Sequence, residues 1–175
     1  MSLIRGFLDR VILVAGIVVG GCLPSFISQY RQRIGGQLDQ VLKDLDAFQQ
    51  IANKYHNGSL RELVQHHLES KDASFNEEGA AVQVMLNSAE QMKLAMQALS
   101  TDLFHQVIYL VTGGLDPIIA KAAWEIFSPA FVLTTESVVF SIVVGLLVWI
   151  TFLFIWKILA AFVDVISGRY FSSTY

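Results

Sequence analysis

Two kinds of hydrophobic pattern alternate along the chain: long apolar runs near its ends and regularly spaced apolar positions between them. The later run, residues 137–156, holds twenty residues and no charge. A helix of that length covers about 30 Å, the thickness of the hydrocarbon core of a bilayer. We therefore expect a transmembrane helix over residues 137–166, in which Lys157 extends its amine to the lipid headgroups. The alternative, a buried core helix, would need more surrounding chain than 175 residues provide.

The earlier run, Val11–Leu23, holds thirteen uncharged residues and follows two arginines. This arrangement also fits a cleaved export signal, and the small residues before Cys22 fit a lipoprotein processing site. Two features argue against cleavage: Asp9 is atypical of the basic part of a signal, and the residues after Cys22 stay apolar, where a processed lipoprotein usually has a polar tether. The sequence favours a retained transmembrane helix over residues 1–28.

Small residues recur inside both runs. Gly16 and Gly20 form a G-x-x-x-G motif, which allows two helix backbones to approach closely in lipid. The expected partner is Gly145 on the later run or a second copy of the chain. Pro24 removes one backbone hydrogen bond, so we expect a kink where the first helix leaves the membrane.

The residues between the runs predict an antiparallel helical hairpin, residues 29–115, with a coiled-coil-like seam. The first seam is spaced 4-3-4-3-4-3: Ile34, Leu38, Val41, Leu45, Phe48, Ala52 and Tyr55. The second is spaced 3-4-3-4-3-4: Val82, Met85, Ala89, Met92, Met96, Leu99 and Leu103. The similar lengths favour pairing of the two helices around a tip at residues 57–74.

Turn and capping residues set the expected ends of these helices. Asn57-Gly58 predicts a left-handed stop, and Ser59 and Ser74, each followed three residues later by Glu, predict helix starts. The second long helix is expected to continue to Gly113-Gly114. Asp116 followed by Pro117 then predicts a new helix start.

Residues 116–136 are expected to form an amphipathic juxtamembrane helix with Trp124 near the edge of its apolar face. Such a helix lies in the plane of the membrane interface or packs on the base of the hairpin, and the sequence leaves both open. Residues 167–175 are expected to form a tail.

The charge distribution predicts an orientation. The chain is 54% hydrophobic and 15% charged, with a net charge of −3. Residues 1–28 and 137–175 hold four Lys/Arg against two Asp/Glu, whereas residues 29–136 hold eight against thirteen. Because basic residues near membrane helices tend to stay in the cytoplasm, we expect both termini there and the middle domain in the periplasm. The small acidic net charge argues against nucleic-acid binding.

Motifs for enzymatic chemistry are missing from the sequence: it contains no phosphate loop, dinucleotide fingerprint, nucleophile elbow or H-E-x-x-H. We therefore expect no catalytic, cofactor-binding or metal-binding residues. The histidines are expected to be solvated, since the adjacent pair His66-His67 points in different directions on a helix.

The stretch "LPSFISQYRQRIGGQLDQ", residues 23–40, resembles a family of short proteobacterial membrane proteins, the domain of unknown function 2937. The resemblance rests on L-P-x-F followed by Q-Y-x-Q-R-[LI]-G-G, and it implies a two-span plan but no activity. Within the stretch, Arg33 is placed to bind a lipid phosphate or a carboxylate of a partner helix, or to form part of a polar collar where the helix leaves the bilayer.

These features together predict a non-enzymatic bacterial inner-membrane protein that acts as a scaffold or accessory subunit. It would self-assemble or join other membrane-protein subunits, in contact with membrane lipid. An oligomeric transport or channel subunit and a lipid-interacting envelope protein are the alternatives.

Overall fold

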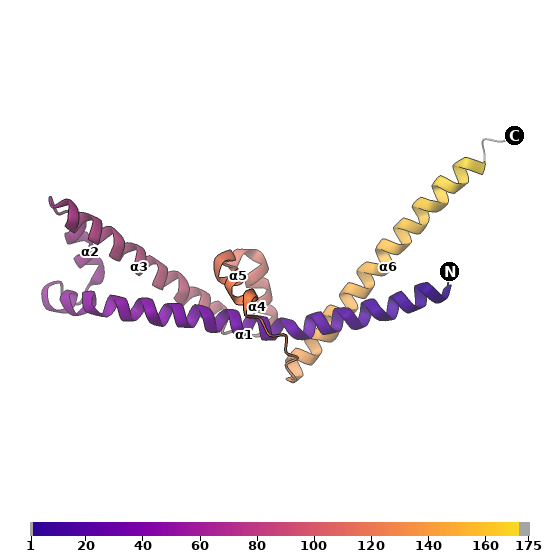
Figure 1. The fold of residues 1–175 in the computed structure, drawn as a ribbon, viewed down its shortest axis with the longest axis horizontal. Coiled ribbons are helices and arrows are strands. Elements are labelled where there is room, and N and C mark those ends of the chain that lie inside the picture. Colours follow the sequence, from indigo (N-terminus) through magenta and orange to yellow (C-terminus); the bar gives the residue numbers. More distant parts are fainter. Residues whose placement is uncertain (1, 172–175) are drawn as a thin grey trace. The chain divides into compact units, whose positions relative to one another are not determined.

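The computed structural model describes the backbone of residues 2–171 and the side chains of residues 6–163. The described part of the chain is helical and contains no strand, which confirms the all-α class. The elements are α1 (Ser2–Tyr55), α2 (Leu60–Leu68), α3 (Ala73–Ala98), α4 (Leu103–Tyr109), the π-helix η1 (Leu110–Gly114), α5 (Pro117–Glu125) and α6 (Thr135–Phe171) (Figure 1).

The chain divides into two compact units, and α1 contributes to both. The first unit consists of residues 1–26 and 128–175, and the second of residues 27–127. Pro24 lies inside α1 and does not end it. Each unit is described by itself below.

In the second unit, α1, α2 and α3 share one hydrophobic cluster. Its buried members are Leu45, Val64, Val82 and Ala89. Partly buried side chains at predicted seam positions, including Leu38 and Met85, pack against it. Tyr55, expected to close the first seam, is instead exposed, so the buried seam of α1 ends at Ala52.

The caps explain where α2 and α3 begin. Asn57 and Gly58 both have positive φ, so the predicted left-handed stop after α1 is confirmed. Ser59 caps α2 and accepts a hydrogen bond from the Glu62 amide. The predicted start at Ser74 is wrong: Asp72 caps α3 and accepts from the Ser74 amide. An aspartate two residues upstream can form the same Asx-type bond.

The second long helix is interrupted, contrary to the sequence prediction. α3 ends at Ala98, and α4 begins at Leu103 after a new N-cap at Asp102. The seam spacing of 3 and 4 continues across this break, so periodicity alone could not reveal it. Gly113, with φ 112°, marks the end expected at the glycine pair, because L side chains rarely adopt that conformation.

The first unit combines the N-terminal part of α1 with the non-helical residues 128–134 and α6. Among the described residues, two helices are long and apolar enough to cross a membrane, with window mean hydropathies of 2.3 for α1 and 2.9 for α6. α6 continues to Phe171, so residues 167–171, expected to be part of a tail, have helical backbone. The predicted helix over 116–136 is shorter than expected, since α5 ends at Glu125.

Candidate functional site

The glycines singled out in the sequence meet where α1 and α6 come into contact. A methyl group added at Gly16 would lie 3.0 Å from the Cα of Gly145. One added at Gly20 would lie 2.9 Å from the Val144 Cβ, and one at Gly145 would lie 2.4 Å from the Ile17 Cγ1. Side chains at these positions would force the backbones apart. Of the two partners considered for Gly16 and Gly20, the structure places Gly145 of the same chain beside them.

Most other buried residues of the first unit are also small or polar, and most of its large apolar side chains are exposed. The buried positions are Gly16, Gly20, Gly21, Ser25, Ser137, Phe140, Ser141 and Gly145. Val19 and Phe154, by contrast, are exposed over about two thirds of their surface (68% and 65%). Ser141 satisfies its own hydroxyl by donating to the carbonyl of Val138 at 2.8 Å. Apart from Phe140, every buried residue named here is glycine or serine, so the contact depends mainly on close backbone approach.

In the second unit, Tyr30 joins α1 to the start of α5. Its side chain is almost completely buried. The hydroxyl accepts a hydrogen bond from the Asp116 amide at 2.9 Å and donates to the Gly114 carbonyl at 3.5 Å. Sequence reasoning did not single out Tyr30, although it lies inside the "QYRQRIGG" stretch. A tyrosine within an otherwise polar segment was the available signal.

Arg33 lies three residues further along α1 and is half-buried. Its Nε is buried and has no hydrogen-bond partner among the described residues. The adjacent exposed arginine, Arg31, donates to the Leu99 carbonyl at 3.4 Å. Two guanidinium groups therefore lie on the segment of α1 that carries Tyr30.

The other two predicted contact residues, Trp124 and Lys157, are exposed. The Trp124 indole stacks on the Phe127 ring at a centroid distance of 5.4 Å, while the neighbouring Ala123 is fully buried. α5 thus packs through Ala123, and the Trp124 side chain is 66% exposed. Lys157 lies on α6, in the first unit, whereas Arg33 and Trp124 belong to the second unit.

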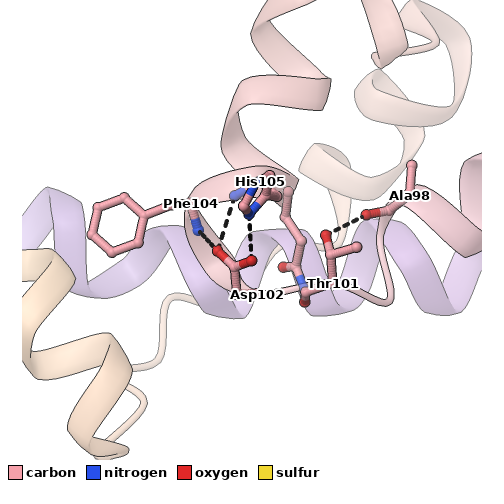
Figure 2. A network of polar contacts seen from close by, with 6 residues as sticks. Ala98, Thr101, Asp102, Phe104 and His105 are labelled. Atoms are coloured by element: carbon pink, nitrogen blue, oxygen red, sulfur yellow. Dashed lines mark hydrogen bonds and ion pairs between the residues drawn. The ribbon is translucent and has the colours of Figure 1, made fainter.

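A polar network fixes the start of α4 (Figure 2). One Asp102 oxygen accepts from the amides of Phe104 and His105 at 3.1 and 3.2 Å, and the other pairs with the His105 Nδ1. The hydrogen bond from the His105 amide, followed by that from its side chain, lowers the pKa of the Asp102 carboxyl. Thr101 donates to the Ala98 carbonyl at 2.8 Å. Sequence reasoning missed this cap, although Ser-Thr-Asp before an apolar stretch is a helix-start signal.

The expectation that all histidines are solvated is wrong for His67. This residue is buried, packs edge-on against Phe75 at 5.0 Å, and lies under Gly79, where an added methyl group would be 2.7 Å from its Cβ. The absence of a side chain at Gly79 creates the space that His67 fills. Within the described residues, no group of three His, Cys, Asp or Glu side chains is arranged to hold a metal ion.

Comparison with known families adds one finding. The family described as "Protein of unknown function (DUF2937)" matches residues 4–164. The chain belongs to this family. The DUF2937 match covers both units, including the α1–α6 contact and the Tyr30 junction, and so confirms the resemblance seen in the "QYRQRIGG" stretch. No curated protein and no solved structure matches the chain significantly.

Proposed function

We propose that this DUF2937 protein is a two-pass protein of the bacterial inner membrane that acts as a non-enzymatic scaffold or accessory subunit. The observation that carries the proposal is the burial pattern of α1 and α6. In the most apolar windows of these helices only 28% and 17% of the residues are buried within the chain. A core helix of a soluble protein is mostly buried, whereas a membrane helix exposes its large apolar side chains to lipid.

The small-residue contact between α1 and α6 supports the same proposal. Apolar side chains gain no hydrophobic free energy by leaving lipid. Membrane helices therefore associate through close backbone packing at Gly, Ala and Ser. Gly16, Gly20 and Gly145 fit this rule. The charge distribution favours cytoplasmic termini and a periplasmic middle domain.

We further propose that α1 and α3 form the antiparallel hairpin of this middle domain. The Leu45 cluster, the Arg61–Glu90 ion pair at 2.7 Å, and the approach of Arg31 to Leu99 support this arrangement. The hairpin would present a polar outer surface to subunits of a larger membrane complex. Its role would be recognition and positioning through helix–helix contacts.

Two measurements on membranes from cells expressing the full chain test the proposal. Alkaline carbonate should leave the protein in the pellet, and cross-linking before gentle detergent extraction should give a particle heavier than one 19.5 kDa chain plus its detergent. Release by carbonate would refute membrane insertion. A monomeric particle without cross-linked partners would refute the scaffold role and leave the two-pass topology standing.

A further inference from the structure

The first part of α1 carries a hollow on its surface, which we call the α1 hollow. It measures about 670 Å³ and is lined by Phe7, Arg10, Val11, Val14, Ala15, Val18 and Val19. The five large apolar side chains of this lining are between 45% and 68% exposed. Ala15 gives the surface its depth, because its small side chain lies between Val11, four residues before it, and Val19, four residues after it.

The α1 hollow lies on the side of the helix that faces away from α6. Gly16 contacts α6, and Val14 and Val18 lie two positions before and after Gly16, which is about 200° around the helix axis. None of the described residues of α6 lines the hollow. The contact between α1 and α6 therefore leaves it open within the first unit.

One cation lies near an end of the hollow. Arg10 belongs to the lining, and its side chain is exposed. The adjacent Asp9 lies on the other side of the helix, since it precedes Leu13 by four positions and Gly16 by seven, on the face toward α6. One of its carboxylate oxygens is buried. The described lining thus combines one guanidinium with apolar side chains only.

The α1 hollow covers one half of the first apolar run. The nine residues from Arg10 to Val19 rise about 14 Å along α1, close to half of the roughly 30 Å hydrocarbon core. From Gly20 to Phe26 no residue is exposed, and the Phe131 ring lies over Gly21. A lipid acyl chain reaches from the headgroups to the middle of the bilayer, so it matches this length. A partner membrane helix would need an open face along the whole run.

We propose that the α1 hollow binds one anionic phospholipid, with an acyl chain along its valines and the headgroup phosphate at Arg10. Arg10 directly precedes the uncharged run, where the hydrocarbon core would begin. A guanidinium donates paired hydrogen bonds to phosphate oxygens, and its charge favours an anionic lipid over a neutral one. This inference rests on the proposed function, because it requires α1 to span the membrane. It adds a specific lipid partner to that function.

Lipid retention by the full chain tests the proposal. The wild type and four variants are reconstituted in vesicles of equal parts phosphatidylglycerol and phosphatidylethanolamine and extracted in mild detergent, and native mass spectrometry counts the lipids that remain on each chain. Arg10→Gln removes the charge, and Ala15→Leu fills the hollow. Lys157→Gln and Ala160→Leu are the matched controls, since they make the same changes at exposed positions of α6.

We expect the wild type to retain one phosphatidylglycerol in preference to phosphatidylethanolamine. Arg10→Gln should reduce the retained phosphatidylglycerol about fivefold, the contribution of one cation at an anionic lipid surface. Ala15→Leu should reduce retention of both lipids, and the two controls should match the wild type. Equal retention in all five proteins would overturn the inference, because the lipid would then be bulk lipid. A loss in Arg10→Gln alone would also overturn it, because the acyl chain would not use the hollow.

Two further measurements separate the remaining outcomes. In a Cys22→Ala background, Val14→Cys should not cross-link between copies. Efficient cross-linking without retained lipid would show that a second copy covers the hollow, and would overturn the inference. Carbonate extraction of the same vesicles reports insertion of the chain. Release by carbonate would refute the proposed function itself, whereas full resistance without retained lipid would refute the lipid site alone.

Discussion

The helix α1 buries different kinds of side chain in the two units of the chain. Up to Phe26 it buries glycine and serine and exposes valine and phenylalanine. From Ile27 onward it buries isoleucine, leucine and tyrosine and exposes aspartate, lysine and glutamine. The same helix therefore uses close backbone approach in one unit and burial of large apolar side chains in the other. The difference teaches that the two halves are built for different solvents: lipid, as we propose, and water.

The largest expected effect concerns the second unit. Leu45→Ala removes the centre of the α1–α2–α3 cluster and leaves a cavity, so it should lower the free energy of unfolding by about 2–5 kcal/mol. Leu42→Ala, at a partly exposed position on the same helix, should change it by no more than about 0.5 kcal/mol. Urea unfolding of the detergent-solubilised chain measures both. Equal changes in the free energy of unfolding would contradict the conclusion that burial of large apolar side chains stabilises this unit.

A charge placed on each outward surface tests the difference in solvent directly. Leu147→Arg on α6 should disfavour insertion by about 3 kcal/mol, because it puts a guanidinium in the hydrocarbon core. Leu94→Arg on α3, a leucine of similar exposure, should leave insertion unchanged. The carbonate-resistant fraction of newly made protein reports the outcome. Equal carbonate-resistant fractions for the two variants would contradict the proposal that α6 faces lipid and α3 faces water.

The small-residue contact should be sensitive to added volume. Gly145→Leu forces side-chain atoms against Ile17 and the Leu13 carbonyl, and overpacking of this kind costs about 1–3 kcal/mol. Ala160→Leu adds similar volume at an exposed position of the same helix and should have little effect. Thermal unfolding in detergent, followed by circular dichroism, compares the two. Equal midpoints would show that the α1–α6 contact contributes nothing to stability.

Tyr30→Phe should have a smaller effect, about 1 kcal/mol, because it removes the hydroxyl that accepts from the Asp116 amide and keeps the buried ring. Tyr55→Phe is the control, since Tyr55 is exposed. Hydrogen exchange at the start of α5 should speed up only in the Tyr30 variant. Unchanged exchange there would mean that the junction is held by packing alone.

The smallest expected effect is a pH dependence of the melting temperature that comes from the Asp102 cap of α4. The folded state lowers the pKa of Asp102, so the charged cap stabilises the fold above the carboxyl's ordinary pKa near 3.8 and this stabilisation is lost as the pH falls through the lowered value. Asp102→Asn keeps a capping oxygen but no charge. The wild type should melt slightly higher than this variant at neutral pH, and the difference should shrink as the pH falls below 3.8. A difference that stays constant as the pH falls would contradict this cause.

Much of this architecture follows from local sequence. Continuous apolar runs of sufficient length, the 3-4 spacing of Leu45 and Val82, and turn residues such as Asn57-Gly58 determine helices and their inward faces almost without reference to the rest of the chain. The helix break at Ala98 and the cap at Asp72 were less predictable, because several Ser, Thr and Asp residues compete to cap the same segment. The sequence indicated Arg33 and Trp124 as contact residues, but it did not indicate which groups lie around them.

The sequence by itself determined the helical class, the two apolar runs and the seam positions, because these depend on periodicity and on residue volume along one helix. Only the tertiary structure decided which glycines meet, that Tyr30 holds the start of α5, that His67 is buried under Gly79, and that Phe104, Ile108 and Val111 face outward. Each of these depends on how helices pack against one another and not on the pattern along a single helix. Periodicity gives a helix its faces, and the contacts between helices decide which face is covered.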